Sequence, residues 1–574
     1  MKKPSVSQYI VSALAQAGVQ RVYGIVGDSL NGVTEAVRRH PDVDWVSVRH
    51  EETAAFAAGA EAQLTGRLAV CAGSSGPGCI HLVNGLYDAQ RSLAPVLALA
   101  AHIPSTEIGT GFFQESHPDR LFVDCSHYSE LISSPRQMPR TLQIAMQTAI
   151  TRRGVAVVVL PGDVALAEMT DMDLAHPIAG DCSRSQPCDD TLAELADLLT
   201  GKARVTILAG AGCAGAHGQL LEVAATLKAP IVHTLRGKEH VAYDNPYDVG
   251  MTGLIGLRPG YKALERCDVL LMLGTDFPYT EWYPKGKTII QVDIDGQRLG
   301  RRCGLTLGVQ ADVRETLTAL LPLLVKKEDS GHLDQAVKQH VSARKRLDEH
   351  VRKSTKDKPI NPEYLTTIVS ELASSDAVFT ADVGMCTVWA ARYLEMTRER
   401  RLLGSFTHGS MANALPQAIG AQLCYPDRQV ISLSGDGGFT MLLGDFITLV
   451  QAGLPVKVVV YNNSSLAMVK LEQNVAGLPD FGTQLENPNF AKVAEAMGAR
   501  GIRVEDPGEV RSAVASALET DGPVLVDVLT NPGELSMPPK TTLKQVQGYS
   551  LYLIKEILGG RAGGAIESLR SSRR

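Results

Sequence analysis

The sequence predicts an α/β fold of three doubly wound parallel-sheet domains followed by a C-terminal amphipathic tail. Short apolar segments rich in β-branched residues alternate with helical segments along most of the chain, as expected of parallel sheets covered by helices on both faces. The length of 574 residues favours several domains over one. After Pro538 and Pro539 the alternation stops, and a mixed polar and apolar end follows.

Two linkers divide the chain. A stretch rich in Pro, Ser and Asp, Ala175 to Asp190, separates the first domain from the second, and a charged helical connector, Arg344 to Lys358, leads into the third. The expected boundaries are 1–175, 185–340, 345–535 and, for the tail, 536–574. The first and third units are similar in size and pattern, which suggests an internal duplication of architecture without a clear sequence repeat.

Composition narrows the class of protein. Hydrophobic content of 44% and charged content of 21% are those of a globular protein with large cores. A net charge of −6 predicts no nucleic-acid partner. Ten cysteines without a C-x-x-C pair argue against a zinc site and for a reducing cytoplasm. The first segment has the apolar pattern of a helix, not of a signal peptide. The sequence contains no run of about 18 apolar residues, so we expect no membrane span.

The first domain should begin with a helix, Val6 to Gln16, and continue with alternating strands and helices. The expected strands are Arg21 to Tyr23, Trp45 to Val48, Leu68 to Cys71, Val96 to Ala100 and Val155 to Leu160.

Glu51 follows the second of these strands and opens an apolar helix. A carboxyl desolvated there could donate or accept a proton. The structural alternative is a first-turn glutamate stabilised by the helix dipole. The glycine-rich turn 73–78 has two readings as well: backbone amides brought to an anion or ring, or a simple strand-to-helix connection.

The central domain should contain strands Val205 to Leu208, Ile231 to Thr234, Val269 to Leu273 and Ile289 to Ile294. The turn 210–215 satisfies G-x-G-x-x-G, but the acidic residue expected about 20 positions later is missing, which argues against an ordinary NAD site. Loops at the carboxyl ends of these strands are where a nucleotide would lie. The alternative is a silent Rossmann-like spacer.

The third domain should contain strands Ala377 to Thr380 and Val524 to Val528, and between them lies the stretch that organises the chain. An apolar strand, Val430 to Leu433, enters the turn 435–438, an apolar helix follows through 441–450, and a second strand, Val456 to Tyr461, ends at Asn462 and Asn463. Both strands of a βαβ unit are parallel, so Asp436 and Asn463 should emerge at one sheet edge. Their oxygens suit Mg²⁺. The alternative is that Asp436 is only part of a turn and Asn463 only a cap.

The tail should contain a helix over Leu543 to Leu558, and arginines follow at 570, 573 and 574. A short basic amphipathic end can lie reversibly on an anionic membrane surface. The competing interpretation is a docking helix with a frayed polar end.

Taken together, these motifs resemble the thiamine-diphosphate enzymes that include pyruvate oxidases, acetolactate synthases and 2-oxo-acid decarboxylases. The Gly-Asp-Gly and Asn-Asn stretch is similar to the cofactor motif of that family, and Arg49-His50-Glu51 is similar to its activating-glutamate motif. The resemblance covers essentially the whole chain. Within the family it is strongest to the peripheral-membrane flavoenzymes that oxidise pyruvate with a quinone, on segments such as 243–256, 400–422 and 548–558.

The resemblance implies site residues. Asp436, Asn463 and the carbonyl of Ser465 would bind Mg²⁺. The reaction pocket would include Glu51, Phe113, Gln114 and Met468. Thiamine diphosphate would be held by Glu51, Gly409, Ser410, Met411, Gly435, Asp436, Gly437, Gly438, Asn463, Ser464, Ser465, Leu466, Ala467, Met468 and Val469. FAD would lie on Thr252, Gly253, Leu254, Ile255, Thr275, Asp276, Phe277, Pro278, Tyr279 and Asp293.

The reaction implied by the resemblance is oxidative decarboxylation of pyruvate to acetate and CO₂, with electrons passing through FAD to a membrane quinone such as ubiquinone. Glu51 would serve a cofactor held by another subunit, in a homotetramer built as a dimer of dimers. The enzyme would be cytoplasmic and reversibly bound, through its tail and a phospholipid surface, to the inner face of the cell membrane. The alternatives are a carboligase of the acetolactate-synthase kind with structural FAD, and an oxygen- and phosphate-dependent pyruvate oxidase that makes acetyl phosphate.

The sequence also departs from the resemblance at two places. Met468 stands where the nearest relatives carry an aromatic residue beside the flavin. The end 571–574 lacks the Trp or apolar anchor that strengthens membrane binding.

Overall fold

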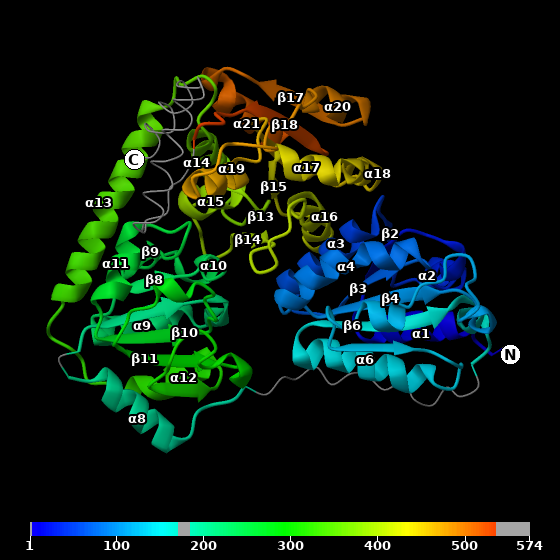
Figure 1. Ribbon diagram of the computed structural model, residues 1–574, viewed down its shortest axis with the longest axis horizontal. Helices are drawn as coiled ribbons and strands as arrows, with labels where there is room; N and C mark the ends of the chain where they lie inside the picture. Colours follow the sequence, from blue (N-terminus) through cyan, green and yellow to red (C-terminus); the bar gives the residue numbers. More distant parts are fainter. Residues whose placement is uncertain (1–2, 170–183, 202, 535–574) are drawn as a thin grey trace.

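The computed structural model describes residues 3–169, 184–201 and 203–534. This part of the chain folds into three six-stranded sheets, in each of which all paired strands are parallel. Helices cover the sheets, and the three layered units lie around a common centre (Figure 1). The predicted α/β fold with three doubly wound sheets is confirmed. The predicted tail, 536–574, lies outside the described residues.

The first and third sheets have the same strand order. The first runs β2-β1-β3-β4-β6-β5 and the third runs β14-β13-β15-β16-β18-β17, so each is ordered 2-1-3-4-6-5 within its own domain. The strands of the first are β1 (Arg21–Gly24), β2 (Asp44–Ser47), β3 (Ala69–Gly73), β4 (Val96–His102), β5 (Tyr128–Leu131) and β6 (Val155–Pro161). The strands of the third are β13 (Val378–Ala381), β14 (Arg401–Gly404), β15 (Val430–Gly435), β16 (Lys457–Asn462), β17 (Arg500–Val504) and β18 (Val524–Leu529). The suggested duplication of architecture is therefore visible in the topology.

The central sheet differs. Its order is β12-β11-β10-β7-β8-β9, the 3-2-1-4-5-6 arrangement of dinucleotide-binding folds read from the other edge. Its strands are β7 (Val205–Ala209), β8 (Ile231–His233), β9 (Asp248–Met251), β10 (Val269–Leu273), β11 (Thr288–Asp293) and β12 (Leu307–Gln310).

Helices connect the strands of each unit. In the first domain they are α1 (Val6–Gln16), α2 (Asn31–Arg39), α3 (Glu51–Thr65), α4 (Pro77–Arg91), α5 (Pro118–Leu121), α6 (Met138–Arg152) and α7 (Gly162–Leu166). In the central domain they are α8 (Asp189–Leu199), α9 (His217–Leu227), α10 (Lys238–Val241), α11 (Arg258–Arg266) and α12 (Val313–Leu320). The long α13 (Gly331–Lys353) runs beside the central and third domains (Figure 1).

The helices of the third domain are each six to eleven residues long. They are α14 (Pro362–Leu372), α15 (Met385–Tyr393), α16 (Ala414–Cys424), α17 (Asp436–Met441), α18 (Phe446–Gln451), α19 (Ala467–Val475), α20 (Phe490–Ala496) and α21 (Val510–Glu519). Single 3₁₀ turns occur at η1 (Asp28–Leu30), η2 (Ser105–Glu107), η3 (Ala211–Cys213), η4 (Thr280–Trp282), η5 (Gly296–Arg298), η6 (Leu321–Leu323), η7 (Leu443–Asp445) and η8 (Pro507–Glu509).

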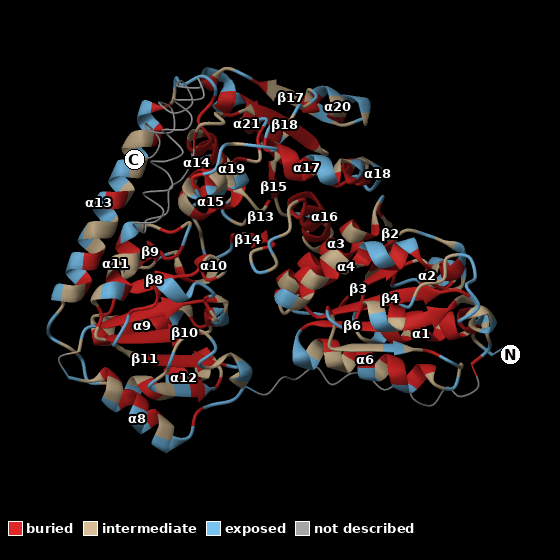
Figure 2. Cartoon of the chain, viewed as in Figure 1, coloured by how far each residue is buried: buried red, intermediate tan, exposed pale blue. Residues whose placement is uncertain are grey.

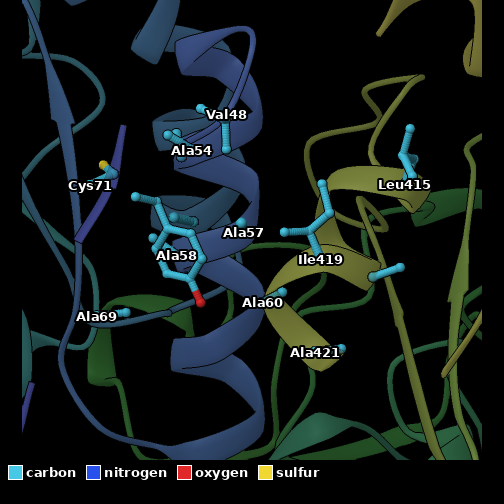
Figure 3. Close-up of a cluster of buried hydrophobic side chains, with 14 of the residues drawn as sticks. Val48, Ala54, Ala57, Ala58, Ala60, Ala69, Cys71, Leu415, Ile419 and Ala421 are labelled. Atoms are coloured by element: carbon cyan, nitrogen blue, oxygen red, sulfur yellow. The ribbon is translucent and has the colours of Figure 1, made fainter. Parts of the chain in front are cut away.

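One hydrophobic core joins the first and third domains. The inner strands of all three sheets are buried over most of their length (Figure 2), and a single cluster of buried side chains contains residues of both α3 and α16. Ala57 and Ala60 of α3 lie beside Ile419 of α16 (Figure 3). A Cβ placed on Gly420 would come within 2.2 Å of the Ala57 carbonyl oxygen, so the two helices pack with almost no side chain between their backbones.

Two expectations about helices were wrong. The connector helix was expected over Arg344 to Lys358 but runs from Gly331 to Lys353. It begins earlier because the helical pattern continues towards the N-terminus beyond the most basic part of the segment. The helix expected over 441–450 is interrupted by η7, and α18 begins only at Phe446. The side chain of Asp445, at this break, accepts a hydrogen bond from the first domain.

Candidate cofactor-binding site

An open cavity of about 620 Å³ lies at the carboxyl edge of the third sheet. The segments that follow β13, β15, β16 and β18 supply its walls. The order of the sheet reverses between β13 and β15, and ligands of open α/β sheets bind at such a switch point. The lining residues that the sequence had singled out are Met411, Gly435, Asp436, Gly437, Gly438, Asn463, Ser465, Leu466, Ala467, Met468 and Val469.

Asp436 and Asn463 do meet at this edge. The backbone amides of Asn463 and Ser464 donate to Oδ2 of Asp436 at 3.0 and 2.6 Å, and the Gly437 amide donates to Oδ1 at 2.8 Å. Burial raises the pKa of the Asp436 carboxyl, while these amides oppose the rise. The carboxylate is thus held in one orientation at the start of α17, beside the end of β16.

Asn487 supports Asp436 and was not found from the sequence. Its Nδ2 donates to Oδ2 of Asp436 at 2.8 Å and to Oδ1 of Asn462 at 2.9 Å. Asn462 in turn donates to Asp527 of β18 at 2.9 Å. The network passes from the cavity into the sheet, and its only sequence signal was Asn462, the first asparagine of the Asn-Asn pair.

The backbone around the cavity requires small residues and carries local strain. A Cβ on Gly437 would lie 2.7 Å from Leu466, and one on Gly438 would lie 2.3 Å from the Asp382 carboxylate. Ser464 and Ala412 have positive φ values of 52° and 65°. Left-handed non-glycine residues persist where surrounding structure holds them, often at functional sites.

Further lining residues were missed. They come from the segment after β13, from α14 and α15, from β16 and from the segment after β18: Pro362, Val383, Gly384, Met385, Cys386, Trp389, Tyr461, Thr530, Asn531 and Glu534. The Asp382-Val383-Gly384 strand ending was a visible signal for the first of them. Burial raises the pKa of Asp382 to about 7.

Glu51 does not line the cavity of its own chain. It is buried at the N-terminus of α3, where Oε2 lies 2.9 Å from Nδ1 of His81, and the His50 and His81 rings stack 4.3 Å apart. Phe113 is 78% exposed, and Gln114 has a positive φ of 61°. The residues that line the cavity all come from 362–534, so these three residues and the cavity are separate in one chain.

Gly409, Ser410 and Ser464 also fall outside the lining. Ser410 and Ser464 are next to lining residues: the Ser410 hydroxyl donates to the Met411 carbonyl at 2.9 Å, and the Ser464 amide binds Asp436.

In the central domain, the loops expected to bind a nucleotide follow β9, β10 and β11. Thr252, Thr275 and Asp293 are buried, and burial raises the pKa of Asp293. Asp276 pairs with Arg301 at 3.1 Å and with Arg302 at 2.9 Å. The ring of Phe277 lies within 2.8 Å of a Cβ built on Gly253. Leu254 and Tyr279 are partly exposed, and Ile255 packs against the core of the third domain.

The G-x-G-x-x-G turn is occupied by the protein itself. The amides of Gly210 and Gly212 donate to the carbonyls of Leu273 at 2.9 Å and Gly274 at 3.0 Å. A Cβ on Gly212 would lie 2.5 Å from Gly274 Cα. The glycines allow two backbones to pack together, and two of the amides a pyrophosphate would need are already paired.

The cavity fits a magnesium-bound diphosphate. It offers a buried carboxylate, an asparagine oxygen and glycines at a helix start, which are groups that hold Mg²⁺ and phosphate. Ser465 lines the cavity, and its Oγ is buried without a hydrogen-bond partner among the described residues.

Fold and cavity together fit a protein that binds a diphosphate cofactor at the carboxyl edge of a parallel sheet, and comparison with known families agrees. The N-terminal, central and C-terminal domain models of the thiamine pyrophosphate enzymes match residues 4–121, 192–320 and 382–528. The chain belongs to this family of enzymes.

Particular relatives are similar over almost the whole chain. A Bacillus subtilis protein, named only as thiamine pyrophosphate-containing, is 37% identical over 97% of this chain and 96% of its own length. Pyruvate oxidase of Lactiplantibacillus plantarum is 32% identical over 92% of this chain and 89% of its own. The large subunit of acetolactate synthase isozyme 2 of Escherichia coli is 32% identical over 91% and 95%.

Among the residues that the structure describes, no helix is both long and apolar enough to cross a membrane.

Proposed function

We propose that this protein oxidises pyruvate to acetate and CO₂, using thiamine diphosphate with Mg²⁺ in the cavity, FAD on the central domain and a membrane quinone as electron acceptor. One observation carries the proposal: the candidate flavin loop is bound to a wall of the cavity. Nε and Nη2 of Arg392 donate to the carbonyls of Ile255 and Gly256, both at 3.0 Å.

Arg392 belongs to α15, and Met385, Cys386 and Trp389 of the same helix line the cavity. A second contact secures this boundary, since Nζ of the buried Lys238 donates to the Ala391 carbonyl at 2.9 Å. The loop that would hold the flavin is therefore joined through Arg392 to the helix that lines the thiamine diphosphate cavity. An electron-transferring flavin needs this proximity, whereas a purely structural one does not.

The described residues also suit a flavin. Oγ1 of Thr252 is buried without a hydrogen-bond partner in the described part of the chain, in the loop that Arg392 fixes. Thr252 to Ile255, Thr275 to Tyr279 and Asp293 would hold FAD.

When bound, thiamine diphosphate supplies the electron sink for cleaving the bond beside a 2-oxo group, and FAD supplies the two-electron acceptor. The chain positions these groups. Asp436, Asn463 and Ser465 would hold Mg²⁺, and Gly435, Gly437 and the segment Asn463 to Val469 would surround the diphosphate. Met468, on the cavity wall, would lie toward the flavin as a flexible apolar contact.

Glu51, Phe113 and Gln114 would act on the cofactor of a second subunit, in a homotetramer. Support comes from the cavity, whose lining residues contain none from the first domain, and from the exposed Phe113. Hybrid oligomers test whether each site takes residues from two subunits. A Glu51→Gln chain and an Asp436→Asn chain, each inactive alone, should regain activity when mixed, because one site then has both intact residues. Hybrids without activity would contradict a shared site.

The tail would bring the enzyme reversibly to the inner face of the cell membrane. Its sequence pattern supports this, but the segment lies outside the described residues. Truncation after Gly548 should leave FAD-loaded enzyme that no longer binds anionic phospholipid vesicles. Unchanged vesicle binding would refute this role.

Product analysis tests the proposed reaction. With pyruvate and a soluble quinone, the enzyme should form acetate and CO₂ in equal amounts without phosphate. Acetolactate as the main product would indicate a carboligase instead. Acetyl phosphate and peroxide, formed only with phosphate and oxygen, would indicate an oxygen-dependent oxidase.

A further inference from the structure

Glu51 stands at the start of α3, and the geometry of this start is fixed by another domain. The backbone amide of Arg49, two residues before Glu51, donates to Oδ1 of Asp445 at 2.7 Å. Asp445 ends η7 in the third domain and is 1% exposed. Hydrogen bonds to carboxylates are stronger than those between neutral groups, particularly when buried.

Asp445 is itself held in place. The Thr448 hydroxyl donates to the same Oδ1 at 2.9 Å. Burial raises the pKa of the Asp445 carboxyl, and the nearby hydroxyl of Thr53, in the first turn of α3, opposes the rise, although no hydrogen bond joins Thr53 Oγ1 to Asp445 Oδ2. Arg49 adds an outer contact, with Nη2 2.5 Å from Oε1 of Gln451. The Asp445 carboxylate is thus close to Arg49 and Thr53, which flank Glu51 in the sequence.

The same turn is bound on a second side. Nδ2 of Asn84 donates to Oε1 of Glu52 at 2.7 Å and to the Ser410 hydroxyl at 2.8 Å, and Oδ1 of Asn84 lies 2.8 Å from Nε2 of His408. Ser410 bonds Met411, which lines the cavity. The close packing of α3 on α16 continues the contact along the helix (Figure 3).

We propose that Asp445 is a positioning residue for Glu51, so that the third domain of one subunit sets the glutamate that acts on the cofactor of its neighbour. The proposal rests on the shared site proposed above. Asp445 is nine residues from Asp436, through α17 and η7, so one short segment carries both the metal ligand of one site and the support for the glutamate of the other. It touches no reacting atom in this arrangement.

Two matched variants test the role in the whole enzyme. Asp445→Ala removes the acceptor for the Arg49 amide, whereas Asp445→Asn keeps an oxygen there and turns an amide toward Thr53. Because a misplacement of about 1 Å can cost about 100-fold, Asp445→Ala should slow deuterium exchange at C2 of bound thiamine diphosphate by about 10- to 100-fold. Thiamine diphosphate affinity should change little, and Asp445→Asn should stay near the wild type.

A readout without cofactor separates positioning from catalysis. In the apoenzyme, backbone amides of residues 49–56 should exchange faster with deuterium in Asp445→Ala than in the wild type or Asp445→Asn. Unchanged C2 exchange in Asp445→Ala, or a slowing that merely follows a loss of thiamine diphosphate affinity, would overturn the proposal.

The hybrid oligomer tests whether Asp445 supports the Glu51 of its own chain. In the pair of Glu51→Gln and Asp436→Asn chains, the working site takes Glu51 from the Asp436→Asn chain. Adding Asp445→Ala to that chain should slow C2 exchange, and adding it to the Glu51→Gln chain should not. Equal slowing from both chains would overturn the proposal. If the hybrids are inactive, the proposal of a site shared between subunits is contradicted. The Asp445 variants in which every chain carries the substitution still decide whether Asp445 supports Glu51.

Discussion

Arg392 of α15 and Ile255 of the central domain are joined by a hydrogen bond of 3.0 Å from Nε to the carbonyl oxygen. The bond connects a helix that lines the thiamine diphosphate cavity to the loop proposed to hold FAD. Arg392 therefore lies at the contact between the two proposed cofactor sites, and its substitution should affect FAD binding and thiamine diphosphate binding to different extents.

Arg392→Ala should reduce the FAD content of the purified enzyme more than its affinity for thiamine diphosphate. Two carbonyls would lose their donor, at a cost of about 1–3 kcal/mol each where they are buried. Flavin absorbance per subunit, with calorimetric titration of thiamine diphosphate, measures both effects. Arg398→Ala, an exposed neighbour, is the control. Full flavin content in Arg392→Ala would contradict the role of this contact.

Substitutions of Asp436 and Asn487 should weaken the magnesium-dependent binding of thiamine diphosphate to different degrees. Asp436→Asn removes a ligand charge and should weaken thiamine diphosphate binding by about 100-fold or more, and Asn487→Ala removes its orienting partner and should cost about 10- to 100-fold. Titration calorimetry at several Mg²⁺ concentrations measures both. A cofactor affinity independent of Mg²⁺ in the wild type would refute the metal assignment.

His350 should make stability depend on pH in the alkaline range. Ion pairs with Glu363 (2.6 Å) and Glu534 (3.6 Å) raise the pKa of His350 to about 9 from its usual 6.5. Since the folded state favours the charged ring, the stabilisation is full below pH 6.5 and is lost as the pH rises through 9. Its size is on the order of 2–3 kcal/mol.

Thermal unfolding at pH 6.5 and 9.5 checks this expectation. The wild type should lose more stability than His350→Gln over this interval. Equal losses in the two proteins would show that the His350 cluster does not titrate there.

Gly420→Ala should destabilise the junction of the first and third domains. The added methyl group would meet the Ala57 carbonyl at 2.2 Å, and overpacking of this kind typically costs about 1–3 kcal/mol. Gly444→Ala, where a Cβ meets nothing within 4 Å, is the matched control. Differential scanning calorimetry should show a lower melting temperature only for Gly420→Ala.

The sequence predicted the inner strands well and the outer strands poorly, for a physical reason. The strands it missed were β5, β9, β12, β14 and β17, and every one of them is at a sheet edge. Inner strands such as β4 and β16 are buried throughout and read as continuous apolar runs. An edge strand such as β17, which begins exposed and is half-buried for most of its length, has no such pattern.

The site was predictable where one short segment carried it. Asp436 and Asn463 lie in one βαβ unit, so the rule for parallel strands brings them together. Asn487, Arg392 and Asp445 could not be found in this way, because each acts through a contact between segments far apart in sequence. The resemblance named Glu51, but only the packing shows which residues hold it.

The central claim is that pyruvate passes its electrons to a bound flavin, and an anaerobic experiment tests it most directly. Pyruvate added to the oxygen-free enzyme, loaded with thiamine diphosphate, Mg²⁺ and FAD, should bleach the flavin band near 450 nm, and a soluble quinone should then restore it. A flavin that stays oxidised while pyruvate is consumed would contradict the account.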